Sequence, residues 1–163
     1  MKKIIFTTLF LFGFVSISTA FEIDGFISGM SMQEAQKNVK RFSYDKVQVQ
    51  EGRIMAFDYP EKGSNRLVNL IFCNGKLVHI MKSLTPRFDY FTRLVDQKRK
   101  EFGKPVDAWS VPTDVTSNIE SNSITFLWTV DDTIIHVSYT EFSSNNDLSI
   151  SYDTYDWWRK HSR

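Results

Sequence analysis

The chain has 163 residues and a formal net charge of +1; 24% of its residues are charged and 15% are aromatic. This length suits one domain, and 14 Phe, 6 Tyr and 4 Trp supply the apolar surface that disordered chains lack. Loss of residues 1–20, which include two lysines and no acid, changes the net charge to −1. A chain this close to neutral lacks the strong positive field of a nucleic-acid-binding protein, so we expect no nucleic-acid partner.

Residues 1–20 predict a cleaved signal peptide. Two lysines precede the apolar run Ile4–Val15, and Ser18 and Ala20 place small residues three and one positions before the expected cleavage site. The run is too short to cross roughly 30 Å of hydrocarbon as a helix, which favours cleavage over an uncleaved anchor. Phe21, and not the cysteine of a lipobox, follows the cleavage site. We therefore expect an exported protein, periplasmic or secreted, without a transmembrane segment.

Cys73 is the only cysteine, so no intramolecular disulfide can support the fold. It lies directly before the turn pair Asn74-Gly75, where most single cysteines are small, half-buried hydrophobic residues. An intermolecular disulfide or a reactive thiol is the alternative.

Two amphipathic helices are expected. The first begins with a capping box formed by Ser31 and Glu34, and its apolar residues recur at helical spacing up to Ser43. The second begins at Pro86, where a missing N–H costs nothing, and ends at Gly103.

Four strands in two hairpins are expected between these helices. The first hairpin runs over Val47–Tyr59 and turns at Glu51-Gly52. The second runs over Leu67–Lys82 and turns at Asn74-Gly75, the pair favoured in a type I′ turn because both positions need a positive φ. With this register, three residue pairs share one apolar face: Phe72 with Leu77, Leu70 with His79, and Val68 with Met81. A histidine in this setting is typical of a core or an edge and not of a catalytic base.

The last third of the chain is predicted to be a loop followed by three strands. Ser110–Ser123 is polar and is interpreted as a loop. Ile124–Val130 and Ile135–Tyr139 alternate in polarity on either side of a turn at Asp131-Asp132, and Leu148–Tyr152 forms the final strand. The face opposite the apolar one carries Thr125, Thr129, His136 and Ser138, so we expect it to meet water or a partner.

This order, α-β-β-β-β-α-β-β-β, predicts an α+β fold. Strands joined by short turns are antiparallel neighbours, and two helices cannot cover both faces of seven strands. We therefore expect a two-layer sandwich with both helices on one face of an antiparallel sheet. Residues 21–156 form the single domain, and residues 157–163 form a Trp-containing basic tail. A helix followed by a hairpin occurs twice, which suggests two similar halves.

Two short motifs carry a resemblance to known families. Gly29–Ala35 (GMSMQEA), followed by hairpin strands, resembles the helix opening of exported proteins related to β-lactamase-inhibitor proteins and to small outer-membrane assembly lipoproteins of the BamE/SmpA type. Glu101–Pro105, before a Trp-bearing strand, resembles a pattern of other exported α+β proteins. The chain departs from the lipoproteins in lacking the lipobox cysteine, and from the inhibitors in lacking paired cysteines. The resemblance implies an α+β fold and a tendency to bind proteins.

Few residues point to catalysis. The three histidines lie on separate segments, and no zinc motif, nucleophile elbow or glycine-rich phosphate loop is present, so we expect no metal site, no cofactor and no enzyme. Asp131-Asp132 are interpreted as turn residues. A hydrolase remains an alternative that requires His136 to lie near an acid such as Asp153.

The C-terminus is the main candidate binding site. Trp157 and Trp158 precede Arg159 and other basic residues. One interpretation is a tryptophan that closes the core beside a solvated tail. The others are a protein-binding patch, because Trp and Arg are enriched at interfaces, and a weak membrane-surface contact. The polar hairpin face with His136, next to Tyr155, is a second candidate surface.

The sequence therefore favours an exported, non-enzymatic protein-binding module, such as an inhibitor, an immunity protein or an envelope accessory protein. Its partner would be a protein of the cell envelope. The alternative is a binder of a small ligand or cell-wall fragment, with aromatic residues in a groove between the sheet and the loop at 110–123.

Overall fold

The structure is a computed structural model that describes residues 20–59, 66–116, 119–142 and 145–161. The expected signal peptide, up to residue 19, lies outside the described residues. In chain order the elements are β1 (Glu22–Ile23), β2 (Phe26–Ile27), α1 (Met32–Lys40), β3 (Lys46–Gln50), β4 (Arg53–Phe57), β5 (Leu67–Cys73), β6 (Lys76–Leu84), α2 (Phe88–Phe102), β7 (Asp107–Thr116), β8 (Ile119–Val130), β9 (Thr133–Phe142), β10 (Asn146–Thr154) and α3 (Tyr155–His161).

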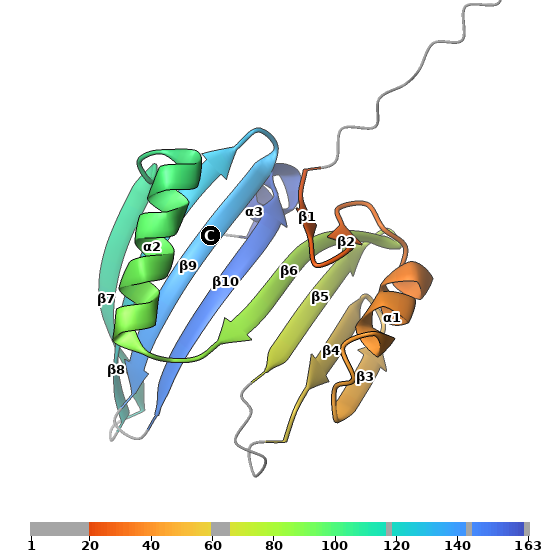
Figure 1. The fold of residues 1–163 in the computed structure, drawn as a ribbon, viewed down its shortest axis with the longest axis horizontal. Coiled ribbons are helices and arrows are strands. Elements are labelled where there is room, and N and C mark those ends of the chain that lie inside the picture. Colours follow the sequence, from red (N-terminus) through yellow and green to blue (C-terminus); the bar gives the residue numbers. More distant parts are fainter. Residues whose placement is uncertain (1–19, 60–65, 117–118, 143–144, 162–163) are drawn as a thin grey trace, which may run out of the picture.

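Eight of the strands form one antiparallel sheet in the order β3-β4-β5-β6-β10-β9-β8-β7, and β1 and β2 form a small separate hairpin (Figure 1). The expected α+β fold with a large antiparallel sheet is therefore confirmed. The order of elements is longer than expected, because β1, β2, β7 and α3 are additional. None of the described helices combines the length and the apolar content that crossing a bilayer requires.

Each half of the large sheet repeats the same order of elements. Helix α1 precedes the four-stranded meander β3–β6, and α2 precedes the meander β7–β10. The last strands of the two meanders, β6 and β10, pair antiparallel at the centre of the sheet. The outer strands β3 and β7 are its edges.

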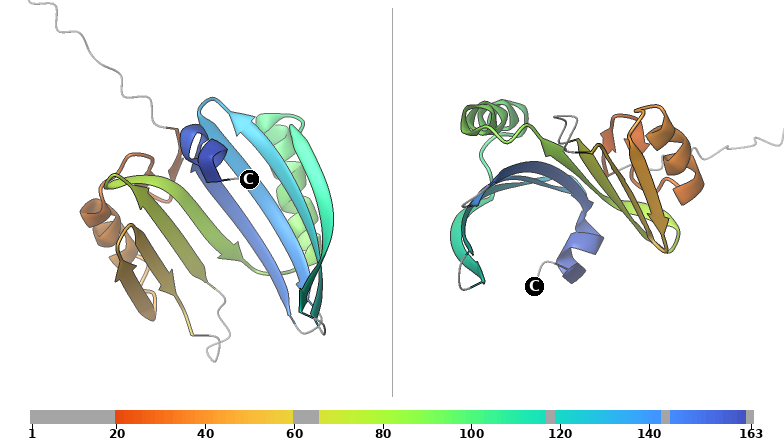
Figure 2. Two further views of the ribbon diagram at one scale, coloured as in Figure 1. Left: turned by 180° about the vertical axis from the view of Figure 1, so that it is seen from behind. Right: turned by 90° about the horizontal axis from the view of Figure 1, so that it is seen from below.

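One face of the sheet carries the hydrophobic core. A row of paired, buried residues crosses all the inner strands on this face: Ile54, Leu70, Ile80, Tyr152, Ile135 and Trp128. Ala35 and Val39 of α1, and Phe91 and Leu94 of α2, belong to the same cluster, so both helices cover this face. Figure 2 shows α1 and α2 on one side of the sheet and α3 on the other, inside the curve of β7–β10.

The helix boundaries follow from their caps. The capping box of α1 is confirmed, because the Ser31 hydroxyl accepts from the Glu34 backbone N–H and the Glu34 carboxylate accepts from the Ser31 backbone N–H. Helix α2 begins at Phe88 and not at Pro86, because Arg87 has an extended backbone (φ −112°, ψ 129°) and serves as the N-cap residue. Gly103 has a φ of 82° and ends α2 as expected.

The expected loop at 110–123 is wrong: this segment lies in β7 and β8, which form a long antiparallel hairpin. The polar sequence does not reveal the strands because β7 is an edge strand, where polar residues and a proline are tolerated. Pro112 lies within β7, opposite Asn122. The next turn, at Asp131-Asp132, has the expected register, with Trp128 opposite Ile135.

The hairpin of β5 and β6 contains a bulge that the turn pattern does not predict. Its turn residues have positive φ as expected, but Val78 is an extra residue in β6, so His79 pairs with Ile71 instead of Leu70. The expected face of His79 is therefore wrong, and its side chain lies on the side away from the core. The backbone of Leu77 bonds to the loop before α1, with two hydrogen bonds of 2.8 Å, and this tertiary contact accompanies the bulge.

The C-terminal segment is a helix and not an extended tail. Residues 155–161 form α3, while residues 162 and 163 of the expected tail lie outside the described residues. The backbone N–H of Tyr155 donates to the carbonyl of Asp132, 2.8 Å away, which fixes the start of α3 against the β8–β9 turn. Cys73 is exposed at its hairpin turn and not half-buried.

Candidate functional site

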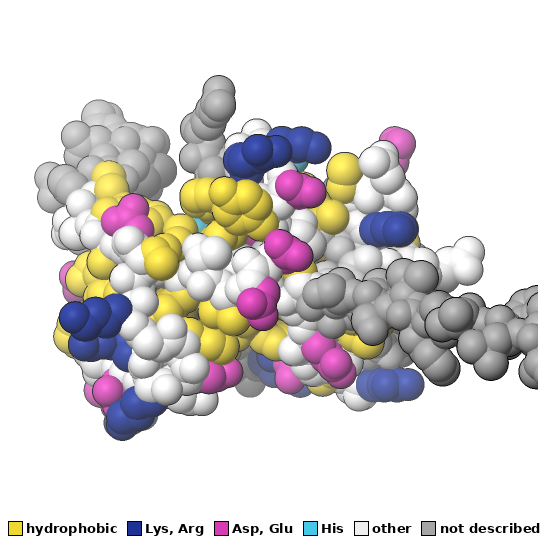
Figure 3. All heavy atoms as spheres, turned by 90° about the horizontal axis from the view of Figure 1, so that it is seen from above, with side chains coloured by type: hydrophobic (Ala, Val, Ile, Leu, Met, Phe, Trp, Pro, Cys, Tyr) yellow, Lys and Arg dark blue, Asp and Glu magenta, His cyan; other side chains and the backbone are white. Residues whose placement is uncertain are grey.

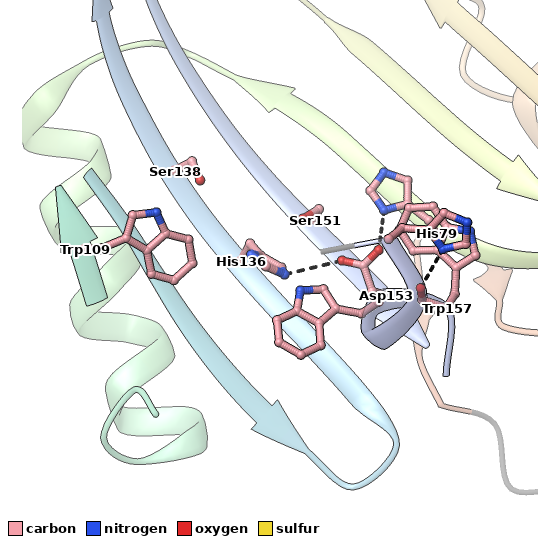
Figure 4. Close-up of a pocket in the computed structure, with 9 residues that line it drawn as sticks. His79, Trp109, His136, Ser138, Ser151, Asp153 and Trp157 are labelled. Carbon is pink, nitrogen blue, oxygen red and sulfur yellow. Dashed lines mark hydrogen bonds and ion pairs between the residues drawn. The ribbon is translucent and has the colours of Figure 1, made fainter. Parts of the chain in front are cut away.

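A pocket of about 410 Å³ lies on the face of the sheet opposite the core, beneath α3. Nine described residues line it: His79, Trp109, His136, Ser138, Ser151, Asp153, Trp157, Trp158 and His161. All three histidines of the chain and three of its four tryptophans are among them. This one cavity gathers most of the histidine and tryptophan side chains, which are few in the sequence. It is therefore the candidate functional site (Figure 4).

The structure places some of the expected site residues in this pocket and leaves others outside it. His136, Trp157 and Trp158 line the pocket, although they come from β9 and α3. Neither tryptophan belongs to the hydrophobic core cluster. Arg159 and Tyr155 also belong to α3, but they are exposed and do not line the pocket.

The strand register brings two histidines to one carboxylate. His79 on β6 lies directly opposite Asp153 on β10, across the junction between the two halves. His136 on β9 lies opposite Ser151, two residues before Asp153, and is therefore its diagonal neighbour on the same face. The bulge at Val78 is essential here, because without it His79 would point toward the core.

Asp153 is buried, and His79 supplies one of its hydrogen-bond donors. The carboxylate is 3% exposed, and its Oδ1 accepts from His79 Nδ1 at 2.5 Å. A buried carboxylate needs such donors, because removing its charge from water without them is costly. Oδ2 has a poorer partner, since its nearest ring nitrogen, His136 Nε2, is 3.5 Å away.

His136 has a buried ring nitrogen without a hydrogen-bond partner among the described residues. This atom is Nε2, the nitrogen that faces Asp153 Oδ2. Burial lowers the pKa of His136 below its ordinary value; the Asp153 carboxylate opposes this shift, and the charge of His79 adds to it. The ring is therefore neutral at neutral pH, with one nitrogen as a donor and the other as an acceptor.

Three tryptophans form the walls of the pocket. Trp157 packs between two histidines, with its ring centroid 5.2 Å from that of His79 and 4.5 Å from that of His161. Trp158 lies on one side of His136 at 6.3 Å, and Trp109 approaches the same ring edge-on at 6.5 Å. Trp109 comes from β7 and the other two from α3, so the walls stand on two separate elements above a floor of β9 and β10.

The polar groups of the pocket are not all satisfied by the protein. Ser138 and Thr125 share a hydrogen bond of 2.8 Å between their hydroxyls. Ser151 has no side-chain hydrogen bond within the described part of the chain, and neither serine bonds to a histidine. The pocket floor therefore offers the Ser151 hydroxyl directly, and the Asp153 carboxylate and His136 Nε2 lie buried beside it.

The charges of the lining residues disfavour some classes of ligand. None of the nine lining residues is a lysine or an arginine, and Asp153 is the only acid among them. Charges of both signs are interspersed on the molecular face shown in Figure 3. Among the residues that the structure describes, no group of three or more His, Cys, Asp and Glu side chains is arranged to hold a metal ion.

The pair that the hydrolase alternative requires does lie together, since His136 Nε2 is 3.5 Å from Asp153 Oδ2. A histidine held by a carboxylate can act as a general base when its other nitrogen meets a substrate or a nucleophile. Neither serine of the pocket is paired with a histidine in this way. The arrangement thus supplies hydrogen-bonding groups without an assembled nucleophile.

Sequence reasoning does not assign His79, Trp109 and His161 to the site, and it names Asp153 only as an acid that the hydrolase alternative requires near His136. His79 is hidden by the bulge, and Trp109 by the polar edge strand in which it lies. One signal could have indicated the pocket: on the final hairpin, His136 and Ser138 share a face, and Ser151 and Asp153 alternate on the next strand. This alternation predicts one polar face across β9 and β10.

No protein-family model matches the sequence, and no curated protein or solved structure shows significant similarity to it.

Proposed function

We propose that this protein binds a small ligand in the pocket on the concave side of its sheet. The observation that carries the proposal is the convergence of all three histidines and three of the four tryptophans on one pocket. A volume of about 410 Å³ lies in the range of ligand sites, roughly 300–1,000 Å³. Apolar walls with a few converging polar groups are the usual composition of such sites.

The polar atoms without close hydrogen-bond partners support the proposal that a ligand binds in this pocket. Buried polar atoms in folded proteins nearly all have partners, and those that lack them need an explanation. Within the described part of the chain, His136 Nε2 has no hydrogen-bond partner, and Asp153 Oδ2 lacks a close one. A ligand with hydroxyl or amide groups would satisfy both atoms.

The proposal is one of binding without a chemical step, and it places the protein outside the cytoplasm. The amino-terminal pattern with its two lysines and the run Ile4–Val15 supports export with removal of residues 1–20. Phe21, the first residue after the expected cleavage site, is buried in the core. A domain that begins at about this position is consistent with cleavage there.

Thermal-shift screening of the purified protein against a library of small metabolites tests the proposal. A true ligand raises the melting temperature in a concentration-dependent way, because it binds only the folded state. The shift should disappear in Trp158→Ala and persist in Val106→Ala, which truncates a residue that is 63% exposed and outside the pocket. A ligand whose shift survives Trp158→Ala would contradict the proposed site.

A second candidate function is protein binding at an edge of the sheet. Val47 and Val49 on β3 are 43% and 49% exposed, and none of the described strands pairs with the outer side of β3. An open edge offers unpaired backbone groups to an extended segment of another protein. This observation favours the envelope protein-binding module that the sequence suggests.

Crosslinking of the tagged protein in envelope extract, read by mass spectrometry, tests this second candidate. Val49→Lys should abolish capture of a specific partner, because a charged side chain on an edge disfavours strand addition. Val106→Ala serves as the control, since Val106 is exposed and lies outside β3. Capture that is equal in all three proteins would exclude the β3 edge.

A further inference from the structure

We infer that the pocket recognises an uncharged saccharide ring. This inference rests on the proposed ligand-binding function and names the chemical class of the ligand. Three features of the described residues support it: the charge of the lining, the hydrogen-bonding groups of the floor, and the aromatic walls.

The charge of the lining disfavours anions. Phosphates, carboxylates and uronic acids are bound best by cationic side chains, and none of the nine described lining residues is a lysine or an arginine. The one acid, Asp153, is buried at 3% exposure and would repel a second negative charge at close range. The ligand is therefore neutral or positively charged.

The hydrogen-bonding groups of the floor match hydroxyls. A hydroxyl both donates and accepts, so one hydroxyl can donate to Asp153 Oδ2 and accept from an N–H of the neutral His136 beside it. A neighbouring hydroxyl on the same ring can bond to Ser151, which lies on the strand opposite His136. Adjacent groups with this double capacity are the defining feature of a sugar ring.

A quaternary ammonium ligand fits the floor less well. Aromatic cages do bind such cations, and three tryptophans are available here. A trimethylammonium group has no N–H or O–H, so it would leave both Asp153 Oδ2 and His136 Nε2 without a hydrogen bond.

The aromatic walls match the apolar face of a sugar. A pyranose presents C–H groups on its faces and hydroxyls around its edge, so it can lie against an indole while its edge contacts a polar surface. Trp109 on β7 and Trp158 on α3 stand on either side of His136, and the polar floor of β9 and β10 runs between them. Trp109 is 38% exposed, which leaves ring surface for such a contact.

Tryptophan fluorescence of the purified protein measures this binding directly. Trp128 is the fourth tryptophan, 1% exposed in the core on the other face, so its emission serves as a constant background. The probes are neutral trisaccharides (N-acetylglucosamine trimer, maltotriose and cellotriose), trigalacturonic acid as the anion, and choline as the cation. We expect saturable quenching or enhancement by at least one neutral trisaccharide and none by trigalacturonic acid or choline.

Four variants locate the saccharide. Trp109→Ala should weaken binding about tenfold or more, because it removes one stacking surface, and Trp109→Phe should restore part of the affinity. Ser151→Ala should weaken binding without disturbing the fold, since its hydroxyl has no partner among the described residues. Val106→Ala, outside the pocket, should bind like the wild-type protein.

The outcomes separate this inference from the proposed function. Binding of choline or trigalacturonic acid with loss in Trp109→Ala would overturn the saccharide class and leave the pocket as a ligand site. Saccharide binding that Trp109→Ala and Ser151→Ala both leave unchanged would also overturn the inference, because the sugar would lie elsewhere. If no probe binds and no library compound raises the melting temperature, both the inference and the proposed function are wrong.

Discussion

The two halves of the sheet share one topology, but the polar side chains on the face away from the core are hydrogen-bonded differently in each half. In the first half, a polar pair on this face is satisfied within the protein: Arg53 Nε donates to Asn69 Oδ1 at 2.6 Å. In the second half, His136 Nε2 remains without a hydrogen-bond partner among the described residues, and Asp153 Oδ2 lacks a close one. The same arrangement of helix and four strands thus carries a paired polar group in one half and an unpaired one in the other.

The difference arises from the segment that comes after the fourth strand of each half. After β6 the chain passes to α2, which packs on the core face, whereas after β10 it forms α3 on the opposite face (Figure 2). Helix α3 adds Trp157 and Trp158 to a face that already curves around it. A short terminal helix therefore converts an open sheet surface into a pocket, and the first half contributes only His79 across the β6–β10 junction.

The largest expected effect tests whether the halves fold as one unit. Leu70 is fully buried in the first half, and Leu70→Ala should lower the free energy of unfolding by about 2–5 kcal/mol. All four tryptophans lie in the second half or in α3, so their fluorescence reports only that region. In urea titrations, the fluorescence and circular dichroism midpoints should fall together, because β6 and β10 pair directly. A fluorescence midpoint that does not move would show that the halves unfold separately.

A second prediction compares two buried acids, Asp153 and Asp58. Asp153→Asn removes a charge-assisted hydrogen bond to His79 in a buried site, so we expect a loss of about 1.5–3 kcal/mol in stability together with loss of ligand binding. The matched variant in the first half is Asp58→Asn, which weakens the pairing with Arg66. Because Arg66 is about half exposed, the stability loss should be smaller, and ligand binding should be unchanged. Equal effects of both variants on binding would argue against a site confined to Asp153.

The pH dependence of stability provides a third test. Because burial lowers the pKa of His136 in the folded protein, the unfolded chain binds a proton there more readily. The stability associated with this residue is therefore complete above the unfolded pKa of about 6.5, and it is lost as the pH falls below that value toward the folded pKa. His136→Asn should show a shallower fall in urea midpoint over this acid range than the wild-type protein. Val106→Ala, which changes an exposed residue without a titratable side chain, gives the control and should leave the slope unchanged.

The smallest expected effect compares the two edges of the sheet. Val49 on β3 and Trp109 on β7 are both partly exposed, so Val49→Ala and Trp109→Ala should each change the free energy of unfolding by little, on the order of 0.5 kcal/mol for Val49. Their effects on ligand binding should differ sharply, because only Trp109 lines the pocket. Calorimetric titration with the best ligand distinguishes them. A loss of affinity in Val49→Ala would contradict the prediction that only the β7 edge takes part in ligand binding.

Local features of the fold could be predicted from the sequence because they depend on neighbouring residues. The capping box of Ser31, the positive φ at Asn74 and the register that places Trp128 opposite Ile135 are all encoded within a few positions. The α+β class follows from these elements, because amphipathic helices and hairpins with one apolar face must pack together.

The site could not be predicted in the same way because it depends on contacts distant in sequence. His79 and Asp153 are 74 residues apart and meet only because β6 pairs with β10. The bulge at Val78 accompanies a tertiary contact of Leu77 with the loop before α1, which no turn pattern reveals. The aromatic and basic composition of residues 155–161 indicates a surface, but only the strand curvature shows that Trp157 and Trp158 enclose a pocket.

The most direct test of the central claim is an NMR titration of the four indole N–H signals with the ligand of highest affinity. We predict that the Trp109, Trp157 and Trp158 signals shift together, while the Trp128 signal, whose N–H donates to the Gly103 carbonyl at 3.1 Å in the core, stays fixed. A Trp128 shift without movement of the other three, or saturation of the ligand with no indole shift, would contradict the account.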